Sequence, residues 1–427
     1  MESREVENGK LKLENLPDGW QTIKVKYIST CNNETLGEET PDDFEIKYID
    51  IGSVTNGKGI ENIQDFYFKT APSRARRVVH TDDVIISTVR TYLKAIASIP
   101  KEYDNYICST GFAVITPNER IHHRFMQYAL ESDNFISNVE KYSVGISYPA
   151  INAEELINFK IYLPPQDQQK KIADFLDSKC SELQSAIDNT KQTIEEYKKL
   201  KQAVITKAVT KGLEPNRKMK ASGIEWIGQI PEEWEVKRIK TLFDLRSEKN
   251  YLPLSEVNLI SLYTDLGVRQ HSDIEATTGN KAMNADGYKK VYKDDIVVNI
   301  ILCWMGAIGR SDYEGVTSPA YDVYKPKENV NSRFYHYYFR TKGFNGDCFK
   351  RGKGIMLMRW RTYADYFRDI SVVAPSETEQ EKIVEYLDRK CSQIDTLISQ
   401  KEQFITELEK YKQSLIYEYV TGKRVLN

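Results

Sequence analysis

The stretch LDSKCSELQSAIDNTKQTIEEYKKLKQAVITKAVT, residues 176–210, returns later in the chain as LDRKCSQIDTLISQKEQFITELEKYKQSLIYEYVT, residues 387–421. The two stretches stay 211 residues apart from end to end, without a gap. An internal repeat determines how a whole chain is organised, so it is interpreted before any single motif. This repeat predicts that the 427-residue chain is built from two related halves that end in the same kind of segment.

Both stretches place an apolar residue about every 3.5 positions, which is typical of helices that pack as a coiled coil. Lys201 and Lys412 interrupt the two apolar seams at the same position of the repeat. A lysine at such a position costs stability but helps to fix the register of the helices. We expect the coiled-coil interface to include Leu176, Leu183, Ile187, Ile194, Leu387, Ile394, Ile398 and Ile405.

The expected helices are too long to be ordinary packing helices. About 45 helical residues, at about 1.5 Å each, form a rod of about 65 Å, whereas helices of globular domains are usually three or four turns long. We therefore interpret the rods as spacers. Two apolar seams in one chain are satisfied most simply if the helices pack on each other in antiparallel fashion. The alternative is an intermolecular coiled coil that only dimerises the protein.

The repetition extends beyond the helices. LPDGWQTIKVKYI (16–28) matches IPEEWEVKRIKTL (230–242), and DDVIISTVRTYLKAIA (82–97) matches DDIVVNIILCWMGAIG (294–309). Each half therefore contains a globular domain in front of its rod. The apolar runs in these domains, such as VIISTV and DIVVNII, are short and β-branched and alternate with Gly, Asn, Asp and Pro, which favours strands.

We expect one or two short helices in each globular domain, near 125–130 and near 334–339. The predicted fold is thus α+β: two β-rich globular domains, each followed by a long α-helix, with the two helices packing as an antiparallel coiled coil with pseudo-two-fold symmetry. The predicted parts are an N-terminal extension (1–15), globular domain 1 (16–163), spacer helix 1 (164–212), a linker (213–229), globular domain 2 (230–374) and spacer helix 2 (375–427).

The composition favours a cytoplasmic protein. The hydrophobic fraction is 40%, and no apolar run reaches the roughly 18 residues of a membrane span. The N-terminal stretch lacks the apolar core of a signal peptide. The six cysteines are scattered without a C-x-x-C pair, which suggests neither zinc nor a disulfide framework. The net charge of −2 means that any nucleic-acid-binding charge must be local.

Three stretches resemble catalytic motifs but fail in detail. GSVTNGKG (52–59) nearly spells a phosphate-binding P-loop, but Gly59 stands where Ser or Thr should hold Mg. In PDDFEIK (41–47), Asp42 and Glu45 belong to one contiguous heptapeptide, whereas nuclease carboxylates converge on a metal from two strands. LPPQ lacks the flanking residues of an amino-methyltransferase motif. We therefore expect neither a catalytic nor a metal site in this chain.

Positive charge gathers in RARR (74–77) and in KRGKGIMLMRWR (350–361). Lysine and arginine interleaved with aromatic residues can contact phosphates and read base edges, although charge runs are often only solvated faces. Further candidates lie in or just after the matched strands. The residues that we expect to contact nucleic acid are Arg74, Arg76, Arg77, Arg90, Tyr92, Lys94, Arg310, Lys350, Arg351, Lys353, Arg359 and Arg361.

With these features the chain resembles, over nearly its whole length, the specificity (S) subunit of type I restriction-modification systems. The segments INFKIYLPPQDQQKKIADFLDSKCSELQSAI (157–187) and FRDISVVAPSETEQEKIVEYLDRKCSQIDTLI (367–398) look like the family's apolar strand, proline, Glu-Gln pair and I-x-x-x-L-D. LPDGW and IPEEW look like its domain-opening signature. The first copy departs from the pattern at Gln168, where the family has Glu, whereas the second copy keeps Glu379.

The resemblance implies a function and a set of partners. The globular domains would be target-recognition domains, each reading one part of a split sequence in double-stranded DNA, and the helices would set the gap between the parts. The chain itself would be non-catalytic. Two methyltransferase (M) subunits would bring S-adenosylmethionine, and motor-nuclease restriction (R) subunits would use ATP and Mg. The half-sites would lie about one DNA turn apart, near 34 Å.

Two other functions remain open from the sequence. A coiled-coil scaffold explains the rods but not the two duplicated β-rich domains. A self-contained nuclease or methyltransferase would need a cofactor or metal constellation that the spacing of residues does not provide. The sequence gives neither the target bases nor the gap length, and it does not say which domain reads which half-site.

Overall fold

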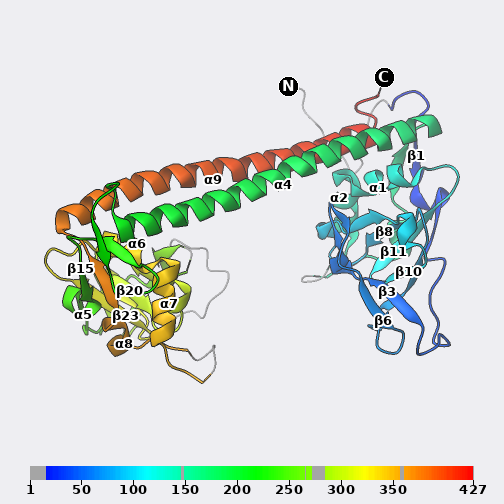
Figure 1. Cartoon of the computed structure of the whole chain (residues 1–427). Coiled ribbons are helices and arrows are strands. Elements are labelled where there is room, and N and C mark those ends of the chain that lie inside the picture. The colour runs from blue at the N-terminus through cyan, green and yellow to red at the C-terminus, as the bar shows by residue number, and fades with distance from the viewer. Residues whose placement is uncertain (1–15, 146–148, 265, 272–283, 356–359, 427) are drawn as a thin grey trace. The chain divides into compact units, whose positions relative to one another are not determined.

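The computed structural model describes residues 16–145, 149–264, 266–271, 284–355 and 360–426. The chain divides into two compact units, which are described one at a time: unit 1 is Met1–Gln192 with Lys401–Asn427, and unit 2 is Thr193–Gln400. The long helices α4 (Gln166–Lys211) and α9 (Glu377–Val420) each contribute one part to each unit (Figure 1). We call residues 16–163 head 1 and residues 230–374 head 2.

In its described residues, head 1 consists of short strands with three α-helices. The strands are β1 (Gln21–Lys24), β2 (Ser29–Cys31), β3 (Glu45–Ile49), β4 (Val54–Thr55), β5 (Gly59–Ile60), β6 (Gln64–Tyr67), β7 (Ala75–Val79), β8 (Val84–Ser87), β9 (Ile96–Ser98), β10 (Tyr106–Ser109), β11 (Phe112–Pro117) and β12 (Lys160–Leu163). The helices are α1 (His123–Glu131), α2 (Asp133–Tyr142) and α3 (Ala153–Leu156), with 3-10 turns η1 (Val25–Tyr27), η2 (Ile51–Ser53), η3 (Thr91–Leu93) and η4 (Lys101–Tyr103).

The central sheet of head 1 has the strand order β2-β11-β8-β9 and is antiparallel. Its strand β8 is buried along its whole length because both faces of the sheet are covered. Val84 and Ile86 point into a core shared with α1, α2 and α4, whereas Ile85 points into a second core against the sheet β6-β3-β10-β7. Alternate residues of a strand face opposite sides, so one continuous apolar run serves both cores.

Head 2 repeats this design. Its strands, with two that precede it, are β13 (Met219–Ala221), β14 (Gln229–Pro231), β15 (Glu235–Arg238), β16 (Phe243–Leu245), β17 (Ile260–Tyr263), β18 (Gly267–Gln270), β19 (Lys289–Val291), β20 (Ile296–Asn299), β21 (Ile308–Arg310), β22 (Gly315–Thr317), β23 (Tyr321–Pro326) and β24 (Ser371–Ala374). Its helices are α5 (Ile239–Leu242), α6 (Ser332–Phe339), α7 (Lys342–Arg351) and α8 (Ala364–Arg368), with 3-10 turns η5 (Leu254–Glu256) and η7 (Cys303–Met305).

The central sheet of head 2 has the order β16-β23-β20-β21, which corresponds strand for strand to the central sheet of head 1. Ile296 and Val298 of β20 face the main core of unit 2, and Val297 faces a smaller second core. The helices expected near 125–130 and 334–339 are present as α1 and α6, and each head has a further helix, α2 or α7, directly after it.

The segment 213–229, which the sequence predicts to be a linker, is folded into unit 2. Strand β13 pairs with β14 in antiparallel fashion, and Ile224 and Ile227 between them are buried in the main core. Trp226 packs against Tyr338 of α6 with ring centroids 5.8 Å apart. A Gly- and Pro-containing stretch thus gains order from the apolar side chains interspersed in it.

The long helices run antiparallel in both units. In unit 1, Lys412 Nζ near the end of α9 donates to Gln184 Oε1 near the start of α4, at 3.3 Å. In unit 2, Lys201 Nζ near the end of α4 pairs with Asp395 Oδ2 of α9, at 2.7 Å. The two lysines occupy the same repeat position, and so do their partners, as pseudo-two-fold symmetry requires. The predicted fold class is therefore confirmed.

The residues expected in the helix seam differ in how deeply they lie. Leu176, Ile187, Ile194, Leu387 and Ile394 are buried, whereas Leu183, Ile398 and Ile405 are half-buried. Leu176 and Leu387 belong to the main core of their own unit, because the heads cover the first turns of the helices that follow them.

Each head is attached to its helix through a repeated pair of polar contacts. Trp20 Nε1 donates to Gln168 Oε1 at 3.1 Å in unit 1, and Trp234 Nε1 donates to Glu379 Oε2 at 2.7 Å in unit 2. The departure at Gln168 therefore keeps a hydrogen-bond acceptor for the tryptophan. In unit 2 the acceptor carries a charge and also pairs with Arg217, whose pKa is raised mainly by that hydrogen bond.

A second repeated contact joins α1 to α4 and α6 to α9. Asp177 accepts hydrogen bonds from Arg124 and from Tyr128 Oη, the latter at 2.7 Å. In unit 2, the equivalent Asp388 accepts from Arg333 Nε at 3.1 Å and from a tyrosine hydroxyl, that of Tyr337, at 2.6 Å. This aspartate is the D of the I-x-x-x-L-D pattern, so the pattern marks the joint between head and helix.

Candidate nucleic-acid interface

The densest basic stretch of the sequence forms the end of α7 and a hairpin after it. Lys350 and Arg351 close the helix, and the chain then turns back so that Lys353 and Arg361 exchange backbone hydrogen bonds of 2.9 and 3.0 Å. Lys350, Arg351 and Lys353 are exposed and Arg361 is half-exposed. Arg359, also predicted to contact nucleic acid, lies outside the described residues.

This hairpin spans residues 352–362, and its described ends are held by ring and hydrogen-bond contacts. The indole of Trp360 stacks on Phe349 with centroids 5.1 Å apart, and its Nε1 donates to the carbonyl of Phe349 at 3.1 Å. Thr362 donates through its backbone to Ile300 O and through its hydroxyl to Cys348 O, at 2.8 and 2.9 Å. These contacts support the described residues at the two ends of the hairpin, and supported side chains are what specific recognition requires.

Lys350 makes an exposed ion pair with Glu225 at 2.6 Å, and this hydrogen bond raises the pKa of the lysine. Lys353 lies over the ring of Tyr366 at 4.3 Å. Exposed pairs of this kind contribute little to stability because water screens them. Both lysines can therefore leave their present partners and bind phosphate oxygens instead.

Head 1 has a hairpin at the same place in the repeat, residues 143–151. Val144 and Ala150 exchange backbone hydrogen bonds of 2.9 and 3.0 Å after α2, and Ile151 N donates to Thr88 O at 2.9 Å. The side chain of Val144 is 80% exposed and that of Tyr142 is 57% exposed. The described residues of this hairpin carry no lysine or arginine. In their described residues, the hairpin of head 1 thus exposes the apolar Val144 where the hairpin of head 2 exposes Lys353.

The turn after β8 lies beside the hairpin of head 1. Arg90 and Lys94 flank the 3-10 turn η3 with φ values of +53° and +49°, and Arg90 N donates to Pro149 O at 2.8 Å. Between them Tyr92 is half-exposed, at 50%. The structure thus brings Arg90 and Tyr92 next to the hairpin, whereas Lys94 Nζ forms an ion pair with Asp133.

RARR lies elsewhere on head 1, on strand β7 of the other sheet. Arg74 is exposed, and the guanidinium of Arg76 lies 4.4 Å from the ring centroid of Phe68. Arg77 donates to Asn32 and to the carbonyl of Phe112, and burial lowers its pKa. The two densest basic stretches therefore occupy different positions in the repeat, and part of the charge of RARR is used inside the head.

Arg310 is also used internally. It sits at the end of β21 with only 11% of its side chain exposed, and it pairs with Asp294 and Asp312. Burial alone would lower its pKa, but the hydrogen bonds to the two carboxylates outweigh burial and leave the pKa raised. A guanidinium that is paired with two carboxylates has few N–H groups free to donate to a phosphate.

Some exposed residues beside the hairpins were not singled out from the sequence. Leu93 of η3 is 49% exposed, Met305 of η7 is 53% exposed, and Ile355 of the hairpin in head 2 is 96% exposed. The available signal was the repeat itself, because η3 and η7 follow the matched strands β8 and β20 at the same distance. Apolar side chains in such places can contact the methyl group of thymine.

The stretches that resemble catalytic motifs have structural roles. GSVTNGKG forms the small hairpin β4–β5, where Gly57 has a φ of +79°, which favours glycine, and lies near the side-chain ends of Lys412 and Gln184. Asp42 of PDDFEIK pairs with Lys69 at 2.7 Å on the surface. Within the described residues, no group of three or more His, Cys, Asp or Glu side chains is placed to hold a metal ion.

None of the helices in the described part of the chain combines the length and the apolar content of a membrane span. All six cysteines are free.

The chain thus has two β-rich heads with the same sheet order, each fixed to its own long helix, and the two helices pair antiparallel. This architecture defines a class of internally duplicated proteins with two binding heads. The chain belongs to the family described as type I restriction modification DNA specificity domain, whose profile matches residues 17–196 and 231–409. The resemblance noted in the sequence is thereby confirmed. Specificity subunits of this family are the non-catalytic chains of their systems.

Individual relatives agree with the family assignment. The putative type I restriction enzyme MjaX specificity subunit of Methanocaldococcus jannaschii is 22% identical over 97% of this chain and 96% of that protein. The MjaVIII specificity subunit of the same organism is 31% identical, but over only 35% of this chain and 33% of that protein. The first of these matches therefore spans both halves, and the second spans about a third of each chain.

Two solved structures share the fold. A chain from a structure on complex assembly and conformational transition of the type I R-M system has a TM-score of 0.74, at 20% identity, over 96% of this chain and 100% of that chain. The HsdS subunit from Thermoanaerobacter tengcongensis has a TM-score of 0.54, at 21% identity, over 97% of this chain and 99% of that chain.

Proposed function

We propose that this chain reads a bipartite sequence in double-stranded DNA, with one half-site per head and a gap set by helices α4 and α9, as the specificity subunit of a type I restriction-modification complex. The observation that carries the proposal is the repeated hairpin beside the turn after the central strand. Its frame is the same in both heads, and its exposed side chains differ. A common frame with different side chains is what reading two unlike half-sites requires.

In head 2, the contacts would come from the basic hairpin. Lysine and arginine side chains that neutralise phosphates set the register on the duplex, and a few arginines that donate two hydrogen bonds to one guanine read the sequence. The proposed residues are Lys353, Arg359 and Arg361 of the hairpin, together with Lys350 and Arg351 at the end of α7. Each good bidentate base contact contributes about 1–3 kcal/mol of discrimination.

In head 1, the proposed contacts are Arg90 and Tyr92 beside the apolar hairpin, with Arg74 and Arg76 as phosphate contacts on a separate edge. Lys94 and Arg77 in head 1, and Arg310 in head 2, were also predicted from the sequence, and we propose that they contribute to DNA binding mainly by supporting the loops that they join. Head 1 would then rely more on shape and apolar contacts with bases than head 2 does.

The chain would dock two methyltransferase subunits, which bind S-adenosylmethionine, and restriction subunits, which use ATP and Mg, in the cytoplasm. Support for equivalent docking positions comes from exposed apolar side chains at the same position of the repeat. Leu200 of α4 is 49% exposed in unit 2, and Tyr411 of α9 is 55% exposed in unit 1. Exposed apolar groups on a helix are typical of contacts with a partner chain.

The test is co-expression of this chain with its neighbouring methyltransferase in a host without modification, followed by mapping of methylated bases across the host genome. We expect a single split motif with a fixed gap. A soluble complex that methylates no motif would contradict the proposal. Reversing the charges of Arg359 and Arg361 should abolish recognition while the complex still assembles, whereas a pure scaffold would be unaffected.

A further inference from the structure

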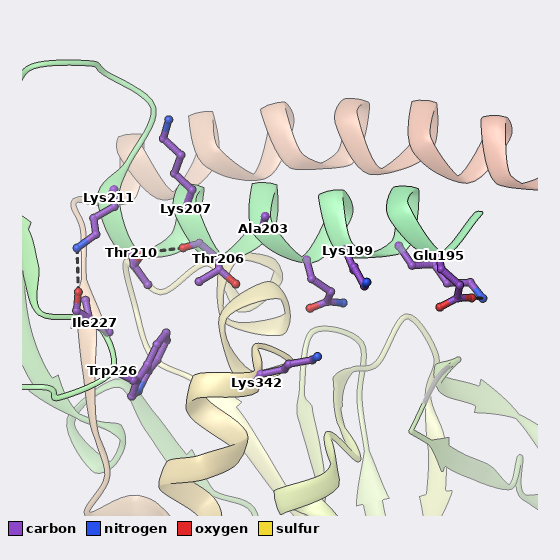
Figure 2. Close-up of a pocket in the computed structure, with 12 residues that line it drawn as sticks. Glu195, Lys199, Ala203, Thr206, Lys207, Thr210, Lys211, Trp226, Ile227 and Lys342 are labelled. Atoms are coloured by element: carbon purple, nitrogen blue, oxygen red, sulfur yellow. Dashed lines mark hydrogen bonds and ion pairs between the residues drawn. The ribbon is translucent and has the colours of Figure 1, made fainter. Parts of the chain in front are cut away.

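A groove of about 720 Å³ lies between the last turns of α4 and head 2, entirely within unit 2 (Figure 2). One wall is the face of α4 that carries Lys199, Ala203 and Lys207, and the other is formed by Trp226 and the first residue of α7, Lys342. The full lining is Glu195, Lys198, Lys199, Gln202, Ala203, Thr206, Lys207, Thr210, Lys211, Trp226, Ile227 and Lys342.

The groove has an excess of positive charge. Lys198 is paired with Glu195 at 2.8 Å, and Lys211 donates to the carbonyls of Ile227 and Gln229. In the part of the chain that the structure describes, Lys199, Lys207 and Lys342 make no ion pair with a carboxylate. All three side chains are exposed: Lys199 and Lys342 lie on the groove side of α4, whereas Lys207 lines the edge of the groove and its amino group points away from Trp226 and Lys342 (Figure 2). Three lysines without carboxylate partners make the groove a site for an anion.

The equivalent place in unit 1 has the opposite charge. Helix α9 follows α4 at an offset of 211 residues, and there Glu409 and Glu418 stand where the groove has Lys198 and Lys207. Helix α2 corresponds to α7, and its first residue is Asp133. The positions of Lys198, Lys207 and Lys342 are thus carboxylate positions in unit 1, whereas Lys199 corresponds to a lysine there, Lys410.

The equivalent place in unit 1 is also occupied by the chain itself. Lys94 Nζ reaches between α2 and α9, where it pairs with Asp133 and donates to Gln413 Oε1 at 3.2 Å. Gln413 corresponds to Gln202 in the wall of the groove, and the position of Lys94 is taken by Gly306 in head 2. Unit 1 therefore contains its own cation at this site, whereas the groove lining of unit 2 has five lysines and one carboxylate, Glu195, which pairs with Lys198.

We infer that the lysine groove of unit 2 binds the phosphate backbone of duplex DNA next to the half-site that head 2 reads. The inference rests on the proposed function and extends it. Helix α7 connects the groove to the basic hairpin: Lys342 begins the helix and Lys350 and Arg351 end it. Ten residues at about 1.5 Å each cover about 15 Å, which is the axial length of four to five nucleotides of one strand at about 3.4 Å each.

The geometry favours DNA over an acidic protein segment because one helix carries both positive surfaces. A duplex held at the hairpin extends beyond it, so a basic site about four nucleotides away meets its backbone. Lysine is also a compact charge on a flexible stem, which suits phosphate neutralisation more than base readout. The groove would strengthen binding by head 2 without changing the sequence that head 2 reads, whereas Lys94 already occupies the equivalent place in unit 1.

The test uses the complex of this chain with its methyltransferase partner and a duplex that carries the mapped target. Lys199→Gln, Lys207→Gln and Lys342→Gln are combined, and the dissociation constant is measured between about 50 and 200 mM salt. Each lost phosphate contact lowers the slope of log affinity against log salt by about 0.9, so we expect a decrease of about 2 to 3. The methylated motif should stay the same, because base readout is untouched.

A matched control removes the same number of charges from exposed positions of α4 and α9 outside the groove: Lys191→Gln, Lys382→Gln and Arg389→Gln. This variant should keep the slope of the unmodified complex. Equal slopes for the groove variant and the control would overturn the inference. So would a groove variant that keeps its slope but loses its protein partner, because the groove would then hold an acidic protein segment.

The outcome for the unmodified chain separates the two proposals. If the unmodified complex methylates a split motif but the groove variant keeps an unchanged slope, only the inference that the groove binds DNA is contradicted. Absence of any motif in the unmodified complex contradicts the proposed function, and the inference about the groove falls with it.

Discussion

Head 1 and head 2 are most alike where they are buried and least alike where they are exposed. The strands β8 and β20 occupy the same place in sheets of the same order, and each divides its side chains between two cores. The hairpins that follow α2 and α7 share their backbone hydrogen bonds, yet one exposes Val144 and the other exposes Lys353. Duplication thus supplied one frame twice, and the surface of each copy specialised.

The attachments of the heads differ in a similar way. Unit 1 joins Trp20 to the neutral Gln168, whereas unit 2 joins Trp234 to the charged Glu379, which also pairs with Arg217. The shape of the joint is retained and its electrostatics are changed. Comparing equivalent substitutions in the two units therefore shows which features belong to the common frame and which belong to one head.

The largest expected effect is on stability, from a substitution in the buried core that the two heads have in common. Trp234 is fully buried in the core of unit 2, so Trp234→Ala should lower the free energy of unfolding by about 3–5 kcal/mol. Urea denaturation measures the loss, and hydrogen exchange locates it in unit 2. Trp20→Ala is the matched change and should weaken unit 1 instead. Loss of protection in both units from either single change would show that the units do not fold separately.

The second effect concerns the hairpins. Lys353→Glu with Arg361→Glu should weaken DNA binding by about 2–4 kcal/mol, or roughly 30- to 1000-fold, because it removes two cations and adds two carboxylates near phosphates. The equivalent changes in head 1, Val144→Glu with Ala150→Glu, add carboxylates only and should cost less. Binding measurements on the cognate duplex make the comparison. An equal loss would mean that the basic side chains of head 2 have no special role.

The third effect tests the joints between heads and helices. Asp177 and Asp388 each accept hydrogen bonds from one arginine and one tyrosine. Hydrogen bonds to a charged group contribute about 1.5–3 kcal/mol, so Asp177→Asn and Asp388→Asn should each lower stability by about 1–3 kcal/mol. Calorimetry should find similar losses for the two variants. A loss confined to one of them would show that the two joints are not equivalent.

The smallest effect is a difference in pH dependence. His336 Nδ1 accepts from Arg310 N at 3.1 Å, as Gln127 Oε1 accepts from Ser98 N in head 1. Burial is the main cause that lowers the pKa of His336 from 6.5 to about 3. The unfolded chain therefore binds a proton below about pH 6.5 that the folded chain does not, and stability, complete above that pH, falls as the pH drops toward 3.

His336→Gln should remove this loss, because glutamine already fills the equivalent role in head 1. Between pH 7.5 and 5.5 the histidine contributes a decrease of about 1 kcal/mol that the variant should not show. Urea midpoints at the two pH values measure it. If the variant and the original chain lose the same stability on acidification, other groups cause the acid sensitivity.

The fold followed from the sequence because the repeat and the apolar periods are properties of neighbouring residues. The seams around Ile187 and Ile394 and the buried runs of β8 and β20 depend on local spacing, which survives in the sequence. The segment 213–229 was harder, because Ile224 and Ile227 gain their order only from contacts with distant parts of unit 2.

The candidate site was less predictable because charge density does not reveal which cations are used inside the fold. Arg77 donates hydrogen bonds to Asn32 and to a backbone carbonyl, and Arg310 forms ion pairs with two aspartates. Both arginines nevertheless stand in or near basic or aromatic stretches of the sequence. Lys94 donates to Gln413 of α9, which lies more than 300 residues away from it in the sequence. Only the register of the two heads shows that the hairpins at 143–151 and 352–362 are equivalent.

The central claim, that the heads read separate half-sites, is tested most directly by exchanging one head. Residues 230–374 are replaced by the corresponding head of another member of the family with a different target, and methylated bases are mapped after co-expression with the methyltransferase. The account predicts that one half of the motif changes while the other half stays the same. A change in both halves, or in neither, would contradict it.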